Sequence, residues 1–231
     1  MALLSPEEWT ALGLSLQVSL VATLASLPFG IAVALALARG QGAWRHVLNG
    51  IVHLPLILPP VVTGYLLLVT FGRKGAVGSF LYDWFGIEFA FRWTGAALAA
   101  AVMAFPLLVR AIRLAIEAVD PRLEEAAETL GANRVWTFLY VTLPLILPGI
   151  LAGAILAFAK AMGEFGATIT FVASIPGETQ TIPSAIYAFL QVPDGGAAAQ
   201  RLVILAVIVA ITALIVSEFV ATRVARRIAG R

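Results

Sequence analysis

The chain has 231 residues, of which 61% are hydrophobic and 12% are charged, and its formal net charge is +2 at pH 7. A soluble domain typically carries about 25% charged residues, so this composition argues against a soluble helical protein and indicates lipid as the solvent. The sequence contains no cysteine, which excludes disulfides, thiolate zinc sites and cysteine nucleophiles. The basic residues lie between apolar runs, so the small positive charge does not indicate nucleic-acid binding.

Five uncharged runs are long enough to cross a membrane once their charged flanks reach its surface. A spanning helix needs about 20 apolar residues to cross a hydrocarbon core of about 30 Å. We therefore predict an all-α polytopic membrane protein that forms a single transmembrane domain over residues 1–231. The expected spans cover residues 12–38, 47–71, 92–114, 138–161 and 201–223.

The basic residues are distributed unevenly between the connections of these five spans. Ten of the 15 Lys and Arg residues fall around Arg39 and Arg45, in the segment 110–137 and in the C-terminal tail "TRVARRIAGR". Since cytoplasmic connections are enriched in Lys and Arg, we expect the N-terminus outside and the C-terminus in the cytoplasm. Arg73 and Lys74 form a basic cluster on the expected outer side, against this trend.

The hexapeptide "LPLILP" occurs at residues 54–59 and again at 143–148. Proline within a helix removes a backbone donor and clashes with the carbonyl group four residues earlier. We expect the first proline of each copy near the first turn of a span, where proline costs little. The second proline would lie one turn deeper and bend the helix. The candidate hinge residues are Pro55, Pro59, Pro144 and Pro148.

The connection between the third and fourth spans contains a short helix, which we place at residues 121–131. Asp120 and Pro121 predict its start, because the carboxylate accepts backbone N–H groups and proline lacks the N–H that would stay unpaired there. Gly131 fits the left-handed position that follows a helix end. Apolar residues at helical spacing form one stripe: Leu123, Ala126, Ala127 and Leu130. Its acids and alanines suit a protein groove better than a membrane surface, where basic residues and bulky aromatics are usual.

This segment resembles the EAA motif of ABC importer permeases. The residues that carry the resemblance are Glu125, Ala126, Ala127, Gly131, Val141, Leu143 and Pro144. Val141 is the one departure, since the motif usually has isoleucine there. The resemblance extends over residues 12–222 and implies that the short helix is a coupling helix, seated in a cleft of the ATP-hydrolysing subunit. The stretches "HLPLILPPVVTGYLLLVTFGRKGAVGS" and "GEFGATITFVASIPGETQTIPSAIY" are similar to the molybdate branch of this family.

The resemblance implies a type I ABC importer permease that moves molybdate across the bacterial cytoplasmic (inner) membrane by alternating access. Its expected partners are a second copy in a homodimer, two cytoplasmic ATPase subunits, a periplasmic or extracellular oxyanion-binding protein and membrane lipid. No stretch reads G-x-x-x-x-G-K-[ST], the phosphate-binding loop of an ATPase. We therefore expect no catalytic residue and no cofactor on this chain, with ATP and Mg²⁺ used by the partner subunit.

Residues 163–199 contain apolar stretches that are too short to span singly. We expect a re-entrant or broken segment packed within protein, the alternative being one tilted sixth helix. Hydroxyl side chains that could contact an oxyanion make up the candidate pathway: Thr63, Thr168, Thr170 and Ser174. Lys160 and Glu164 lie four residues apart, which favours a local ion pair over an oxyanion site. His46 and His53 lack a third ligand, so we predict no metal site.

Other functions remain open at this stage. A sulfate, thiosulfate or tungstate permease would share the same motifs. An ion-coupled carrier or a channel would need ionisable residues within the membrane, for which Glu218 near the end of the last span is the candidate. An intramembrane enzyme would need a nucleophile with a base, or a metal cluster, and the sequence shows neither pattern.

Overall fold

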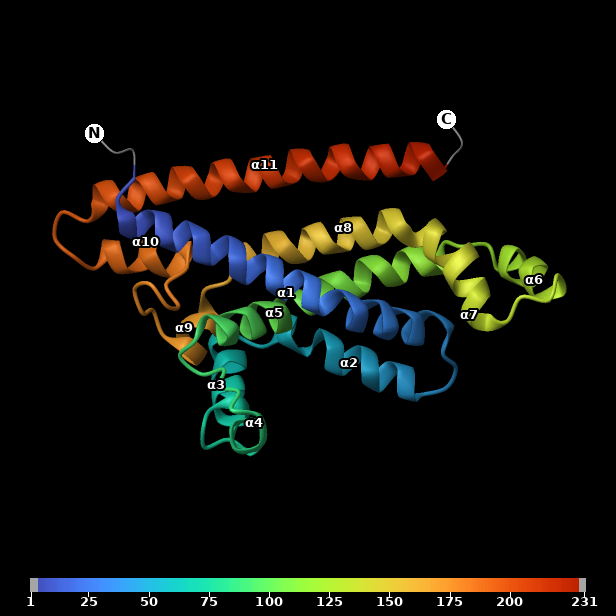
Figure 1. The fold of residues 1–231 in the computed structure, drawn as a ribbon, viewed down its shortest axis with the longest axis horizontal. Coiled ribbons are helices and arrows are strands. Elements are labelled where there is room, and N and C mark those ends of the chain that lie inside the picture. Colours follow the sequence, from blue (N-terminus) through green and yellow to red (C-terminus); the bar gives the residue numbers. More distant parts are fainter. Residues whose placement is uncertain (1–3, 229–231) are drawn as a thin grey trace.

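All regular structure in the described part of the chain is helical (Figure 1). The computed structural model describes residues 4–228, so Arg231 of the basic tail lies outside the described residues, as does the side chain of Glu218. The helices are α1 (Pro6–Arg39), α2 (Trp44–Ile57), α3 (Pro60–Phe71), α4 (Ala76–Phe85), α5 (Trp93–Glu117), α6 (Pro121–Thr129), α7 (Arg134–Thr137), the π-helical turn η1 (Phe138–Thr142), α8 (Leu143–Met162), α9 (Gly166–Val172), α10 (Ile182–Leu190) and α11 (Gly196–Ile228).

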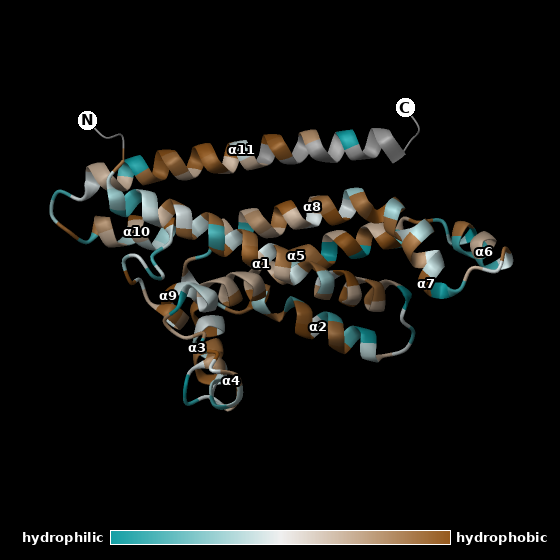
Figure 2. Ribbon diagram, in the orientation of Figure 1, coloured by the Kyte–Doolittle hydropathy of each residue, from teal (hydrophilic) through white to brown (hydrophobic). Residues whose placement is uncertain are grey.

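The long helices α1, α5 and α8 form the centre of an elongated bundle, and α11 lies alongside (Figure 1). Small residues let these helices approach closely, as is usual where lipid rather than water surrounds a bundle. A Cβ atom at Gly149 of α8 would overlap the side chain of Ala115 on α5, and one at Gly30 of α1 would press on Leu108. Hydrophobic residues predominate along the long helices and hydrophilic ones are more frequent near the ends (Figure 2).

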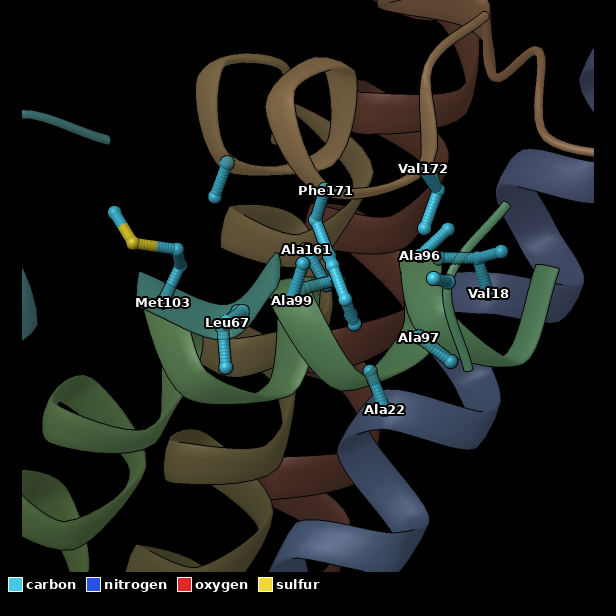
Figure 3. Close-up of a cluster of buried hydrophobic side chains, with 13 residues drawn as sticks. Val18, Ala22, Leu67, Ala96, Ala97, Ala99, Met103, Ala161, Phe171 and Val172 are labelled. Atoms are coloured by element: carbon cyan, nitrogen blue, oxygen red, sulfur yellow. The ribbon is translucent and has the colours of Figure 1, made fainter. Parts of the chain in front are cut away.

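A buried cluster joins α9 to the bundle at the end where α10 lies. Phe171 of α9 is fully buried and points toward the alanine-rich start of α5, near Ala99 (Figure 3). Val18 and Ala22 of α1 close the other side of this cluster. Because α5 presents alanines here, a whole aromatic ring fits between the helices. The cluster fixes α9 firmly although α9 is only seven residues long.

Four continuous helical stretches are long and apolar enough to cross a membrane: α1, α5, α11 and the helix that runs from Arg134 to Met162 through η1. A fifth candidate, α2 with α3, is bent by 113°. The stretch predicted as one span over 47–71 therefore forms two helices with a sharp bend between them. The first helix, α1, extends beyond the predicted span, since it begins at Pro6 with a capping box between Ser5 and Glu8.

The two copies of "LPLILP" have different structures, and the following residue explains the difference. After the first copy comes Pro60, and a residue that precedes proline is pushed from helical to extended backbone. Leu58 and Pro59 accordingly have ψ angles of 144° and 135°, and the helix ends there. The second copy is followed by glycine and stays helical within α8. Pro55 lies in the last turn of α2 and not near the first turn, so that expectation was wrong.

Residues 163–199 form two short helices, α9 and α10, joined by an irregular loop. One tilted sixth helix is excluded, because Ala173 has a φ of 61° and ends α9. The hydroxyl of Thr179 accepts the N–H of Ile175 at 2.9 Å and holds the loop. Ser15 of α1 accepts the N–H of Ile182 at 2.7 Å and ties the start of α10 to the bundle.

Candidate functional site

The short helix α6 begins at the predicted residue, Pro121, and ends at Thr129, two residues before the predicted end. The Asp120 carboxylate accepts the N–H of Arg122 at 3.0 Å, and Pro121 occupies the first turn. Beyond the helix, Gly131 has a φ of 91°, in the left-handed region where glycine is favoured. The N–H of Ala132 then bonds back to the carbonyl of Ala127 at 3.1 Å. Local chemistry is therefore sufficient to define α6 between Asp120 and Gly131.

α6 projects from one end of the bundle (Figure 1), and its apolar stripe is exposed. None of its nine residues, all within the described part of the chain, is buried. Leu130 is 90% exposed and Leu123 is 49% exposed. An isolated helix of this length is unstable in water, and this one leaves apolar side chains uncovered. The exposed stripe is the surface expected of a helix that docks on another protein.

Glu124 ties α6 to the bundle. Its carboxylate pairs with the Arg39 guanidinium at the end of α1, at 2.9 Å, and accepts the Thr142 hydroxyl at 2.6 Å. Among the described residues, no such partner is found for the neighbouring Glu125 or Glu128. Nothing in the spacing of these three acids in the sequence reveals that Glu124 contacts Arg39. Glu124 holds the helix, and Glu125 is left available to a partner.

The two halves of the EAA motif meet at one cleft. Asn133 caps α7 by accepting the N–H groups of Val135 and Trp136 at 3.1 and 3.0 Å. The rings of Trp136 and Tyr140 then stack at 4.8 Å between their centroids. The cleft between α6 and this aromatic wall measures about 460 Å³ and is lined by Ala127, Leu130, Gly131, Ala132, Trp136, Thr137, Tyr140 and Val141. Motif residues on both sides of the loop therefore shape a single surface.

The end of the motif lies in a continuous helix. Leu143 donates its N–H to the carbonyl of Phe138, five residues back, which makes η1 a π-helical turn. Pro144 follows and has no N–H to donate. A wider turn accommodates a proline ring that would clash with the carbonyl of an ordinary α-helix. Leu143 and Pro144 thus join the coupling segment to α8 without a break.

The four candidate pathway residues lie on α3 and α9 or directly after α9, and α3 packs against α9. Thr168 and Thr170 donate to the carbonyls of Phe165 and Gly166 at 2.8 Å, so their hydroxyls serve their own turns. The Thr63 and Ser174 hydroxyl oxygens are buried and have no hydrogen-bond partner among the described residues. These two hydroxyls are the ones left without a structural role.

At the opposite end of α8, Lys160 and Glu164 form the expected local ion pair, at 2.6 Å. Glu164 is 3% exposed and also accepts the N–H of Ala167 at the start of α9. The sequence analysis did not predict a second buried acid, Glu8. Glu8 is fully buried and pairs with Arg201 of α11 at 2.9 Å. The Ser5 to Glu8 spacing was the signal that could have placed Glu8 inside the helix.

The chain matches a known family over most of its length. Residues 26–230 match the profile described as "Binding-protein-dependent transport system inner membrane component". The chain is 58% identical to the molybdenum transport system permease protein ModB of Escherichia coli, covering 99% of this chain and 100% of that protein. It is 52% identical to ModB of Haemophilus influenzae, over 96% of both chains.

More distant relatives share the fold. The chain is 34% identical to the sulfate transport system permease protein CysT of Salmonella typhimurium, covering 98% of this chain and 81% of that protein. It superposes with a TM-score of 0.71 on a chain of a bacterial ABC transporter involved in import of the acidic polysaccharide alginate. That match covers 96% of this chain and 80% of the other, at 21% sequence identity.

Proposed function

The chain belongs to the family of binding-protein-dependent transport system inner membrane components. From this premise we propose that it forms the membrane path by which an ABC importer carries molybdate into the cell. It is a multi-pass permease of the bacterial inner membrane and not an enzyme, since ATP hydrolysis in such importers takes place in a separate subunit. The observation that carries the choice of molybdate is the 58% identity to a molybdenum permease over its whole length, against 34% to a sulfate permease.

The assembly we propose is a homodimer with two cytoplasmic ATPase subunits and an external oxyanion-binding protein. Each copy crosses the membrane five times, with the N-terminus outside and the α6 end in the cytoplasm. The spans are α1, the bent pair α2 and α3, α5, the helix from Arg134 to Met162, and α11. One such bundle encloses little space, so a pathway on the two-fold axis of a dimer is the simplest arrangement.

In the proposed mechanism α6 docks in a cleft of the ATPase subunit and moves when ATP closes the ATPase pair. The contacts of Glu124 with Arg39 and Thr142 supply a physical connection from α6 to α1 and to η1. Movement of these helices reopens the path on the other side, which is alternating access. Thr63 and Ser174, with buried hydroxyls free of partners in the described residues, are the pathway residues we favour. Pro59 is the favoured hinge, because the 113° bend follows it.

Reconstitution tests the assignment. The chain is placed in liposomes with its ATPase and binding protein, and ATP hydrolysis is measured with molybdate, tungstate or sulfate. We expect stimulation by molybdate well above that by sulfate. Equal stimulation by sulfate would overturn the choice of substrate while leaving the importer assignment intact, and transport without ATP would favour an ion-coupled carrier instead.

A further inference from the structure

An apolar groove of about 590 Å³ lies between α1, α8 and α11. Figure 1 shows α11 running alongside α8. The start of α11 is fixed to the bundle by the buried Leu202 and by the ion pair of Arg201 with Glu8. Further along, α11 forms one wall of the groove and is largely exposed. Large side chains that line the groove include Leu16, Leu24, Ile155, Phe158, Ile208 and Val216.

The groove offers nothing to a polar ligand. Among its lining residues, all within the described part of the chain, only Thr23 and Thr212 have polar side chains. Their hydroxyls donate to the carbonyls of Ser19 and Ile208, one turn earlier in their own helices, at 2.8 and 2.7 Å. An oxyanion therefore finds no hydrogen-bond donor here, and the ligand that fits this groove is a hydrocarbon.

The lining of the groove differs from the helix contacts inside the bundle. Within the bundle, small residues such as Gly149 and Ala115 bring two helices together. In the groove Leu, Ile, Val and Phe predominate, and Ala154 and Ala213 are the two alanines. Since close packing of helices in a membrane depends on small residues, this lining favours a flexible acyl chain over a helix of another protein.

A cation lies where the headgroup of such a lipid would be. Val209, Val216 and Arg223 recur at a spacing of two helical turns, so they share one face of α11. Arg223 is exposed, with its guanidinium 5.5 Å from the ring centre of Phe219. α11 rises about 22 Å between Ile208 and Arg223. This length is about half of the full bilayer thickness of about 40–45 Å, so one lipid reaches from the deep end of the groove to Arg223.

We propose that an anionic phospholipid binds at this site, with one acyl chain in the groove and its phosphate at Arg223. A guanidinium donates two parallel N–H bonds to phosphate oxygens. The sequence adds Arg226 and Arg227, and basic clusters at the end of a spanning helix attract anionic lipids. The lipid fills the space between α1 and α11 beyond the ion pair of Glu8 with Arg201. The site requires only that the chain lie in a membrane, so it does not depend on which oxyanion is transported.

A photoactivatable phosphatidylglycerol, with a diazirine at the end of one acyl chain, tests this site. The full chain is reconstituted in phosphatidylcholine vesicles that contain a trace of this probe. After irradiation, mass spectrometry of the peptides locates and quantifies the label. A phosphatidylcholine that carries the same diazirine is the control for the headgroup, and thermal unfolding confirms that each variant is folded.

Two variants, each with a matched control, separate the headgroup from the acyl chain. Arg223→Gln removes the contact with the phosphate, and Arg110→Gln removes the same charge from the exposed surface of α5. Ala154→Phe fills the groove, whereas Ala152→Phe adds the same side chain at an exposed position of α8 that does not line it.

We expect the phosphatidylglycerol label to concentrate on Phe158 and Ile208, well above the label on Ile211, which is exposed on α11 but lies outside the groove. Arg223→Gln should lower the groove label about fivefold, the loss expected for one basic residue at an anionic surface. Ala154→Phe should abolish the groove label, and both control variants should match the wild type.

Three results would overturn the proposal. Equal label on Ile208 and Ile211 would make the groove part of the ordinary lipid surface. Equal labelling of the groove by the phosphatidylcholine probe, or undiminished labelling of Arg223→Gln, would exclude recognition of an anionic headgroup. An unlabelled groove beside a labelled Ile211 would mean that protein covers the groove.

Discussion

Glu124 of α6 and Arg39 at the end of α1 form an ion pair of 2.9 Å that joins the coupling segment to the first long helix. The same carboxylate accepts the Thr142 hydroxyl of η1. Glu124 therefore links one exposed short helix to two of the helices that are long and apolar enough to cross a membrane. Because both charged side chains are partly exposed, the pair contributes at most about 1 kcal/mol to stability. Its importance lies in where it places α6.

Replacing Glu124 should uncouple transport from ATP hydrolysis. In Glu124→Gln the ion pair with Arg39 is lost, so α6 can move without moving α1. We expect molybdate uptake to fall about fivefold or more, on the scale of a coupling energy near 1 kcal/mol, with ATP hydrolysis retained. Uptake by Glu128→Gln, an exposed neighbour for which the described residues provide no hydrogen-bond or ion-pair partner, should equal that of the wild type. Equal uptake by both variants would contradict this role for Glu124.

Replacing Glu125 or Gly131 should weaken binding of the ATPase subunit. Glu125 is exposed on α6, and Gly131 has a φ of 91°, a conformation that costs alanine roughly 1 kcal/mol or more. We expect Glu125→Ala and Gly131→Ala to insert into the membrane normally but to co-purify with less ATPase. Gly86→Ala is the control for Gly131→Ala, because Gly86 also has a positive φ but lies directly after α4, away from α6. If both variants co-purified with as much ATPase as the wild type, the proposal that α6 docks on the ATPase would be contradicted.

The bend between α2 and α3 should depend on two successive prolines. In the double variant Pro59→Ala, Pro60→Ala the restriction on the preceding residues disappears, so the helix can continue. Spin labels at Ile51 and Val69 should then lie farther apart than in the parent chain, by electron–electron double resonance. Pro148→Ala, in the helical copy of the hexapeptide, should leave that distance unchanged. An unchanged distance in the double variant would mean that packing on α9 alone sets the bend.

Close packing of α3 on α9 should make Gly64 sensitive to substitution. A Cβ atom there would meet the backbone of Ala167 and the side chain of Thr170, whereas one at Gly50 meets nothing within 4 Å. We expect Gly64→Ala to lose about 1–3 kcal/mol, the usual penalty of overpacking, and Gly50→Ala to lose nothing. Thermal unfolding of the detergent-purified chain measures both. A melting temperature for Gly64→Ala equal to that of Gly50→Ala would contradict the tight contact.

Local patterns in the sequence predicted much of this structure. Four of the five apolar runs correspond to long helices, and Asp120, Pro121 and Gly131 act where they were expected, because helix ends depend on neighbouring residues. The contacts of Glu124 with Arg39 and of Glu8 with Arg201 could not be predicted, since each joins segments distant in sequence. The bend after Ile57 was visible in Pro59 and Pro60, but its size depends on the packing of α3 against α9.

The unbroken helix from Arg134 to Met162 has 29 residues, which at 1.5 Å each makes a rod about 43 Å long. One end carries the aromatic stack beside α6, and the other leads to Glu164, whose carboxylate caps α9. A rod of this length is a lever. By the same geometry, a tilt of about 5° at the end beside α6 would move the far end by about 4 Å. If α6 docks on the ATPase as proposed, a small displacement there would become a larger one, through one covalently continuous helix, where α9 meets α3.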